Sequence, residues 1–227
     1  MSFIPDKNLY VVSSALRPLT GVWTPEQRFS QTVETLKRIR EKDKKSIILV
    51  TEASVNEIPE NEKQIILSLC DIYYDLTQNQ DVRTLSLNRM QSPAETAVLY
   101  HTFLNLKQQP FLKDCKRIFK ISGRTILEDD FDPEEHNIFG KYIFKKRIPT
   151  WMPHINYGAD SLLITRLYSF CPSLIDNYIE VLAKNFPLLD RLDFEHAHYV
   201  NIPKKYLVDF DKIHCWGWLS GGKIENY

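Results

Sequence analysis

Cysteine is scarce in this sequence, and its positions exclude two kinds of stabilising site. The chain has four cysteines in 227 residues, and none forms the C-x-x-C pair that structural zinc sites use. Their wide spacing also differs from the dense framework of small disulfide-linked proteins. We therefore expect Cys70, Cys115, Cys171 and Cys215 to be free thiols in a reducing compartment.

An excess of charge of one sign and a long apolar run are missing as well. Lysine plus arginine and aspartate plus glutamate number 29 each, so no overall positive field indicates a nucleic-acid partner. No run of about 18 apolar residues occurs, and residues 1–7 have no apolar core, so the sequence predicts neither a membrane span nor a signal peptide. We expect a soluble, cytoplasmic protein.

Two nucleotide-binding motifs are absent from the sequence. It contains no G-x-x-x-x-G-K-[ST], which argues against a P-loop kinase, and no G-x-G-x-x-G, which argues against a dinucleotide-dependent dehydrogenase. If the protein binds a nucleotide, it does so with residues outside these two motifs.

The first 125 residues alternate short apolar runs with amphipathic segments. The runs predict β-strands at 9–12, 46–50, 72–74 and 118–121, and the segments predict helices at 24–40, 61–69 and 92–106. Thr24-Pro25-Glu26-Gln27 and Ser92-Pro93-Ala94-Glu95 look like capping boxes that begin two of these helices. Such strand-helix-strand units pair in parallel with right-handed crossovers. We therefore predict an α/β fold, a single domain over 1–227 with a mainly parallel central sheet flanked by helices.

Polar residues follow each predicted strand of this half. After residues 118–121, Gly123 allows an unusual backbone conformation or close approach to a ligand, and Arg124 supplies a planar cation suited to phosphate oxygens. Because doubly wound sheets bind ligands at the carboxyl ends of their strands, these residues should line one crevice. The substrate-binding residues predicted here are Ser13, Ser14, Arg17, Glu52, Asp75, Arg89, Ser122, Gly123 and Arg124. A simple strand-to-loop turn with a surface arginine is the alternative interpretation of Ser122-Gly123-Arg124.

The second half of the chain is less regular. Residues 142–144 predict a strand and residues 173–184 a helix, with a loop from Pro149 to His154 between them. The aromatic tail from Ile213 to Lys223 should pack back on the domain, and its Gly221-Gly222 indicates either a tight turn or a mobile flap.

Residues 193–199 carry the acidic and histidine side chains of this half. We interpret them as extended, so that Glu195 lies on the opposite face from His196 and His198. The two histidines could bind a metal, although hydrogen-bonded histidines are commoner than ligands.

The order of these elements resembles the GT-A fold of nucleotide-sugar-dependent glycosyltransferases. Phe119–Arg124 is similar to the K-I-S-G-R segment of glycosyltransferases from surface-polysaccharide loci and large DNA viruses, and the similarity extends from Leu9 to His196. The resemblance implies a transfer of a hexose or pentose from a UDP- or GDP-sugar to a glycan or glycoprotein acceptor. It also makes a virus-encoded protein that acts in the host cell one of the origins to consider.

One part of the family pattern is replaced in this chain. Many GT-A enzymes end the strand corresponding to 118–121 in an Asp-x-Asp pair that holds a divalent cation against the donor diphosphate. Here Ser122-Gly123-Arg124 stands in that place. The resemblance therefore leaves two options: Arg124 neutralises the diphosphate itself, or Asp129 and Asp130 hold Mg²⁺ or Mn²⁺ with their carboxylate oxygens.

The resemblance also implies roles for residues of the second half. Residues 157–161 are similar to the acceptor-side segment, and Asp160 and His196 are expected to bind substrate. Glu195 falls where inverting members place the base that takes the proton from the acceptor hydroxyl. Residues 1–125 would then bind the nucleotide sugar and residues 126–227 the acceptor. Loss of the Asp-x-Asp pair keeps open an alternative, a non-catalytic binding or scaffolding module with the same fold.

Overall fold

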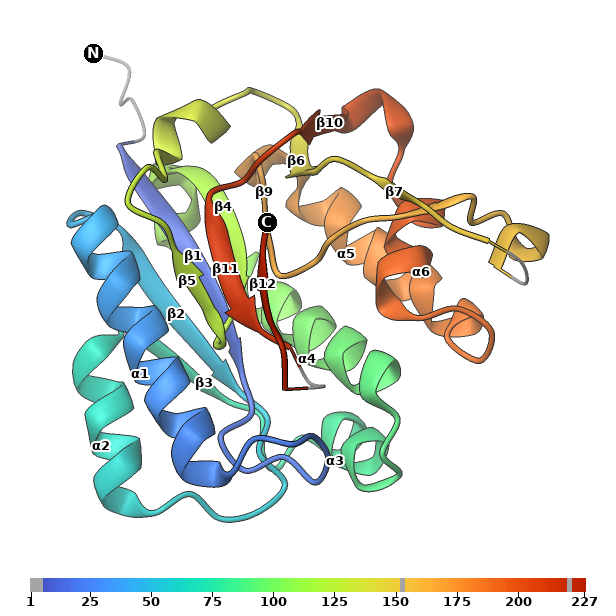
Figure 1. Cartoon of the computed structure of the whole chain (residues 1–227). Helices are drawn as coiled ribbons and strands as arrows, with labels where there is room; N and C mark the ends of the chain where they lie inside the picture. Colours follow the sequence, from blue (N-terminus) through green and yellow to red (C-terminus); the bar gives the residue numbers. More distant parts are fainter. Residues whose placement is uncertain (1–5, 152–153, 220–221) are drawn as a thin grey trace.

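A seven-stranded sheet forms the centre of the molecule in this computed structural model, which describes residues 6–151, 154–219 and 222–227 (Figure 1). Its strand order is β10-β6-β9-β4-β1-β2-β3. The strands are β1 (Lys7–Ser14), β2 (Ile47–Glu52), β3 (Ile72–Asp75), β4 (Cys115–Ser122), β6 (Tyr142–Lys145), β9 (Leu167–Phe170) and β10 (Leu207–Phe210). Strand β9 runs antiparallel to both of its neighbours, and the other pairs are parallel. The predicted α/β fold with a mainly parallel central sheet is confirmed.

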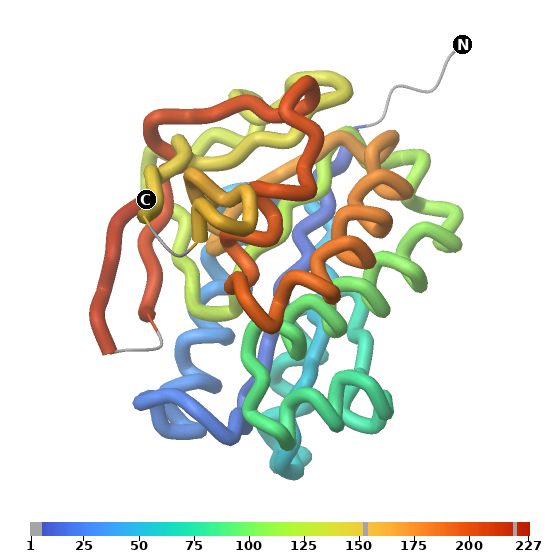
Figure 2. The backbone as a smooth tube through the Cα atoms, turned by 90° about the vertical axis from the view of Figure 1, so that its right-hand side faces the viewer, coloured from blue at the N-terminus to red at the C-terminus, as the bar shows by residue number. Residues whose placement is uncertain are grey.

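Helices cover both faces of this sheet. The helices α1 (Pro25–Lys42) and α2 (Glu60–Leu69) pack on one face, and α4 (Gln91–Leu106) and α5 (Ile175–Asn185) pack on the other, where α3 (Gln80–Leu87) and α6 (Phe194–Asn201) adjoin α4 (Figure 2). Short 3-10 helices are η1 (Pro110–Asp114), η2 (Pro133–His136), η3 (His154–Tyr157), η4 (Pro172–Leu174), η5 (Phe186–Leu188) and η6 (Lys204–Tyr206). Within the described residues, no helix has the length and apolar character that a membrane crossing requires.

Alternation along β1 divides the core into two clusters. Leu9 and Val11 point toward α4 and α5, whereas Tyr10 and Val12 point toward α1 and α2, because successive strand side chains face opposite ways. All four side chains are fully buried. This explains why the strand is a continuous apolar run in the sequence, and why the run predicted it.

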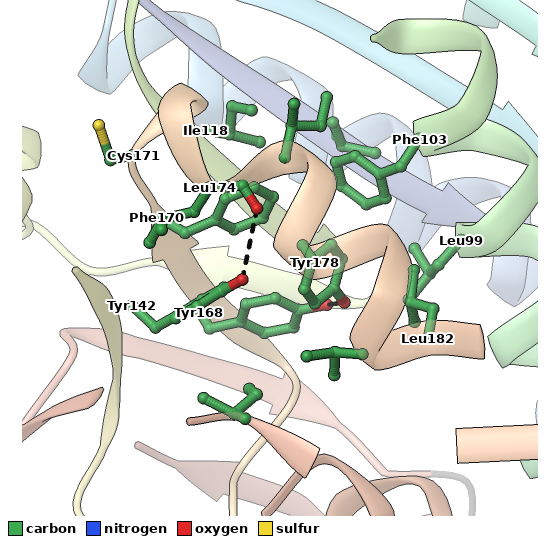
Figure 3. Close-up of a cluster of buried hydrophobic side chains, with 14 of the residues drawn as sticks. Leu99, Phe103, Ile118, Tyr142, Tyr168, Phe170, Cys171, Leu174, Tyr178 and Leu182 are labelled. Carbon is green, nitrogen blue, oxygen red and sulfur yellow. Dashed lines mark hydrogen bonds between the residues drawn. The ribbon is translucent and has the colours of Figure 1, made fainter. Parts of the chain in front are cut away.

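Aromatic side chains fill the space between the sheet and α5 (Figure 3). The Tyr178 ring lies 4.7 Å from that of Phe170 and 5.0 Å from that of Phe103, measured between centroids. Its hydroxyl bonds to the Tyr168 hydroxyl and lies 3.1 Å from Nε2 of His198, on α6. This buried network fixes α6, and with it the acidic first turn of that helix, against the end of the sheet.

The two predicted capping boxes have different outcomes. Thr24 caps α1 as predicted: the Gln27 amide donates to Thr24 Oγ1 at 3.3 Å, and the Thr24 amide donates to Gln27 Oε1 at 2.9 Å. The prediction for Ser92 is wrong, because α4 begins at Gln91 and Ser92 Oγ instead accepts from the Phe194 amide at 3.2 Å. Glu95, freed from a capping role, pairs with Lys120.

The extended conformation predicted for residues 193–199 is also wrong. This segment is helix α6, and Asp193 is its N-cap, with Oδ1 accepting from the His196 amide at 3.0 Å. A capping aspartate outweighs the alternating pattern of Phe194, His196 and His198, because it pairs an amide at the first turn that would otherwise lack a partner.

The C-terminal tail packs on the molecule as predicted. Strand β11 (Cys215–Trp218) pairs antiparallel with β5 (Thr125–Leu127) and with β12 (Ile224–Asn226), in front of the central sheet in Figure 1. A separate pair, β7 (Ile148–Pro149) and β8 (Ser161–Leu162), lies near α6. Four cysteines are free thiols, as expected. The alternatives for Gly221-Gly222 concern Gly221, which lies outside the described residues, as do Met152 and Pro153 of the predicted loop.

Candidate functional site

A cavity of about 390 Å³ opens at the carboxyl ends of β1 and β4, toward the bottom of Figure 1. Its walls come from the loop between β1 and α1, the turn after β4, the start of α4 and the first turn of α6. The volume falls within the usual range for pockets that bind small molecules, about 300–1,000 Å³. We call it the strand-end cavity.

Seven of the predicted site residues line the strand-end cavity. They are Ser13, Ser14, Arg89, Ser122, Gly123, Arg124 and Glu195. Arg89 lies between α3 and α4 with a left-handed backbone (φ 57°), which turns the chain into α4 at the cavity edge. The sheet thus brings residues from distant parts of the sequence together, and their roles stay predictions.

Three predicted residues of the first half lie outside the cavity lining. Arg17 points toward α2, where its Nη2 lies 2.6 Å from a Glu62 carboxylate oxygen. Glu52 is fully buried, and its Oε1 accepts from the Leu16 amide at 3.2 Å and the Ser54 hydroxyl at 2.6 Å. Asp75 is bound by Thr77 and Lys63 at the end of β3. The first two residues hold the loop after β1, and so shape the cavity from behind.

Two predicted residues of the second half also lie elsewhere. Asp160 is exposed at the start of β8, where its carbonyl accepts from the Thr150 amide at 2.9 Å. His196 is buried, with Nδ1 2.6 Å from Asp193 Oδ1, Nε2 2.9 Å from Thr150 Oγ1 and its ring stacked on His154. His198 contacts Tyr178 instead, so the two histidines do not share a ligand.

The glycine after β4 is needed for close packing. A Cβ atom at Gly123 would lie 3.0 Å from Thr32 Oγ1 and 3.3 Å from the Ser13 carbonyl oxygen. The Gly123 amide donates to that Ser13 carbonyl at 2.9 Å, and its own carbonyl accepts from Thr32 at 3.1 Å. The residue therefore joins β4, β1 and α1 at the cavity floor.

Cationic side chains dominate the cavity wall. Arg28, Arg89, Lys120, Arg124 and Arg166 face three carboxylates, those of Glu95, Asp193 and Glu195. Within the described part of the chain, no carboxylate forms an ion pair with Arg28, Arg124 or Arg166. The nine residues outside it contain no aspartate or glutamate. We call these three side chains the arginine cluster.

Two buried nitrogens of Arg124 lack hydrogen-bond partners among the described residues. Its Nε and Nη1 are buried and have no hydrogen-bond acceptor among the described residues, whereas Arg28 donates to the Ala15 carbonyl at 3.1 Å. Burial, and then the like charges of Arg28 and Arg166, lowers the pKa of Arg124 to about 9. Burial lowers the pKa of Arg28 to about 10. Because arginine keeps its proton in proteins, these shifts mean that the charged forms are destabilised, and a bound anion would relieve that cost.

The acidic side of the cavity is built differently. Lys120 is 1% exposed and donates to Glu95 Oε1 at 2.8 Å and to the Thr165 carbonyl at 3.1 Å. Thr165 in turn donates its hydroxyl to Glu195 Oε1 at 3.0 Å. Burial, and then the charges of Glu95 and Asp193, raises the pKa of Glu195 above its usual value. A half-buried carboxylate with a raised pKa has the character of a general base.

Sequence reasoning missed Arg28, Glu95, Lys120 and Arg166 as cavity residues. Arg28 lies in the first turn of α1, directly after the loop that follows β1, so its position was available from the predicted capping box. Arg166 precedes β9, whose antiparallel place beside β4 depends on sheet pairing and has no local signal.

Two predicted metal ligands lie away from the strand-end cavity. Asp129 contacts Arg38, Asp130 lies 2.7 Å from Nδ1 of His214, and both aspartates line a separate hollow beside α1 and β5. Glu128, Asp130 and His214 are close enough together to hold a cation, but Lys212 already lies 2.8 Å from Glu128 and 3.4 Å from Asp130.

Known structures share this architecture. The chain is similar to the mannosyltransferase Ktr4p from S. cerevisiae, with a TM-score of 0.52 and 9% identity over 90% of this chain and 68% of that one. It is similar to the galactosyltransferase LgtC, solved with donor and acceptor sugar analogs, with a TM-score of 0.53 and 9% identity over 90% and 73%. The chain is also similar to a core-mannan synthase from Aspergillus fumigatus in its Mn/GDP form, with a TM-score of 0.49 and 10% identity over 90% of this chain and 73% of that one. No protein-family model and no curated protein sequence matches the chain.

These likenesses confirm the predicted fold: the chain has the fold of GT-A-type glycosyltransferases. The metal of that fold does not fit the end of β4 here. Arg124 is cationic and has no lone pair for a metal, and its neighbours Arg28 and Arg166 add like charge.

Proposed function

We propose that this protein transfers a sugar from a nucleotide-diphosphate donor, a UDP- or GDP-sugar, to a hydroxyl of a glycan or glycoprotein. The observation that carries the proposal is the arginine cluster, three guanidinium groups without carboxylate partners in a cavity at the ends of β1 and β4. A diphosphate is the anion that suits them, because planar guanidinium groups bind paired phosphate oxygens. The sugar transferred is a hexose or a pentose.

In this proposal the arginine cluster neutralises the donor diphosphate without a divalent cation. Arg124 is the central group, because its buried Nε and Nη1 lack acceptors within the described residues and a planar guanidinium group can bridge two phosphate oxygens. Charge then develops on the leaving diphosphate beside fixed cations in a site of low dielectric, which favours departure of the nucleotide. Asp129 and Asp130 play no part in the transfer.

Glu195 is proposed as the base of an inverting transfer. The attacking hydroxyl loses its proton as the new sugar bond forms, and the proton moves to the Glu195 carboxylate. Thr165 orients that carboxylate from one side, and α6 presents it from a capped first turn. Residues 1–125 then supply the donor site and residues 126–227 the acceptor side, where Asp160 and His196 act outside the cavity lining. The cytoplasmic location stays a prediction.

A screen of melting temperatures tests the donor class. We expect UDP, GDP or their sugars to raise the melting temperature, because a ligand that binds only the folded state stabilises it by mass action. At a ligand concentration of 100 Kd, the free energy of unfolding rises by about 2.7 kcal/mol. CMP, with one phosphate, should shift it less. Arg124→Ala should reduce the shift by about half or more, whereas Arg191→Ala, a control at an exposed arginine outside the cavity, should keep it. A wild-type protein that none of these nucleotides stabilises would overturn the proposal.

A second measurement separates transfer from binding alone. With a stabilising donor and a panel of glycan acceptors, the enzyme should release nucleoside diphosphate. Binding of the nucleotide sugar without any release, in the presence or absence of acceptors, would support the scaffolding alternative instead.

A further inference from the structure

The carboxylate of Glu95 lines the strand-end cavity, where one of its oxygens pairs with the buried Lys120 and the other is left open. Its side chain is 39% exposed, and its Oε1 accepts from Lys120 at 2.8 Å. Among the described residues nothing donates a hydrogen bond to its Oε2. A carboxylate that only anchored α4 to β4 could lie on the side of the helix away from the cavity. The free Oε2 of Glu95 on the cavity side therefore suggests that it binds a ligand.

Lys120 keeps this carboxylate ionised and in place. The ammonium group is 1% exposed, and it lies 5.7 Å from the centroid of Tyr168 and 5.9 Å from that of Phe194. Burial acts to raise the pKa of Glu95, but Lys120 together with Arg166 and Arg124 outweighs it, and the pKa lies below its usual value. An ionised carboxylate only accepts hydrogen bonds, so the ligand group beside it must donate them.

This requirement identifies the part of the donor that Glu95 faces. A diphosphate at neutral pH is an acceptor and would be repelled, whereas a hydroxyl is a donor. Glu95 lines the same cavity as the arginine cluster, and it is connected to the proposed base through Lys120, which also bonds to the Thr165 carbonyl, and through Thr165, whose hydroxyl bonds to Glu195. In a nucleotide sugar, the group between the diphosphate and the attacking hydroxyl is the sugar ring.

We propose that Glu95, held by Lys120, accepts hydrogen bonds from the hydroxyls of the donor sugar and restricts the protein to neutral sugars. A uronic acid would bring its own carboxylate toward both Glu95 and Glu195, and this like-charge contact disfavours it. The inference rests on the proposed function and deepens it, since it names the class of sugar.

Calorimetric titration of the full chain tests this inference. The probes are UDP, GDP, UDP-glucose, UDP-galactose, UDP-xylose, GDP-mannose and the acidic UDP-glucuronate. The wild type should bind its best neutral sugar nucleotide about tenfold or more tightly than UDP-glucuronate, the size expected for losing one charge-assisted hydrogen bond. Glu95→Gln should weaken the neutral sugar nucleotide about tenfold, and should leave the matching nucleoside diphosphate unchanged or slightly tighter.

Two further variants keep the test independent of folding. Glu95→Asp preserves the charge but withdraws it by one methylene, so the sugar should bind more weakly while UDP-glucuronate stays disfavoured. Glu134 forms an ion pair with Lys116 outside the cavity. Glu134→Gln removes that carboxylate and should leave the affinity for every probe unchanged.

The outcomes separate this inference from the proposal on which it depends. Equal losses for nucleoside diphosphate and nucleotide sugar in Glu95→Gln would place the carboxylate on the ribose or in a structural role, and would overturn the inference. So would wild-type binding of UDP-glucuronate as tight as that of the neutral sugars. Failure of the wild type to bind either UDP or GDP would overturn the proposed function as well.

Discussion

The two ends of β4 carry arginines in opposite circumstances. Arg117, near the start of the strand, is 1% exposed and donates to Ser169 Oγ at 3.0 Å, the Ser169 carbonyl at 3.1 Å and the Ile138 carbonyl at 2.8 Å. Arg124, directly after the strand, leaves Nε and Nη1 without acceptors in the described part of the chain. Arg117 and Arg124 are seven residues apart in the sequence, and neither forms an ion pair with a carboxylate in the described part of the chain.

The difference distinguishes a structural cation from a binding cation. Burial lowers the pKa of Arg117 to about 10 and, with two neighbouring arginines, that of Arg124 to about 9, so both charged forms are costly. At Arg117 three protein acceptors offset the cost within the fold. At Arg124 no described residue supplies this offset, and the cavity beside it has the size for a ligand that would.

We expect the largest effect, a loss of turnover, from a change at Glu195, the carboxylate in the cavity at the Arg124 end of β4. Glu195→Gln should lower turnover about 10²- to 10⁴-fold and leave donor binding nearly unchanged, because glutamine keeps the shape and cannot accept the proton. Steady-state transfer at saturating donor and acceptor, with donor affinity from calorimetry, measures both. Transfer near the wild-type rate would remove Glu195 from the mechanism.

The pH dependence of the rate sharpens that assignment. Burial and two nearby carboxylates raise the pKa of Glu195, and the base is active only when ionised. The rate should therefore fall as the pH falls through this raised pKa, above the ordinary glutamate value of about 4.3. Rate profiles for wild type and Glu195→Gln provide the check, and an acid limb that persists unchanged in the variant belongs to another group.

At the Arg117 end we expect a loss of stability. Arg117→Met removes three hydrogen bonds inside the protein, to two carbonyls and to the Ser169 hydroxyl, and should cost about 3 kcal/mol. For a chain of this size that lowers the melting temperature by about 6–12 °C. Arg124→Met, the matched change, should keep or raise the melting temperature, because it removes an uncompensated cation. Equal losses of melting temperature in Arg117→Met and Arg124→Met would contradict the proposed difference between a structural and a binding arginine.

A smaller effect is expected when the charge at Arg124 is kept. Arg124→Lys should weaken nucleoside diphosphate binding about tenfold, since a lysine has the charge but lacks the planar fork that bridges two phosphate oxygens. Calorimetry measures the affinity. Wild-type affinity in this variant would mean that Arg124 contributes charge only.

The sequence predicts the Arg124 end of the sheet well and the acceptor side less well. Strands β1, β2 and β4 are buried on both faces, so their apolar runs stand out, and polar residues mark where they end. Glu95 looked like a capping residue because its spacing from Ser92 fits a capping box, although its partner is Lys120, a residue far along the chain. Helix α6 was missed because one capping aspartate decides a helix of eight residues.

The pairing of distant segments explains the remaining failures. Arg166 reaches the arginine cluster only because β9 inserts antiparallel between β4 and β6, and four residues of strand carry too little pattern to show that. Arg17 and Asp75 follow their strands as predicted, yet Glu62 and Lys63 of α2 bind their side chains away from the strand-end cavity. Position at a strand end can be predicted, whereas the direction of a long side chain depends on its neighbours.

One titration tests the central claim, that the arginine cluster takes the place of a divalent cation. Wild type and Arg124→Ala are titrated with UDP and GDP in the presence of EDTA, and again with added Mg²⁺ or Mn²⁺. We predict that the wild type binds one nucleotide in EDTA with an affinity that metal changes by less than about threefold, and that Arg124→Ala loses about 10- to 100-fold in both conditions, as expected for charge-assisted hydrogen bonds. Binding that requires metal, or an affinity unchanged in Arg124→Ala, would contradict the account.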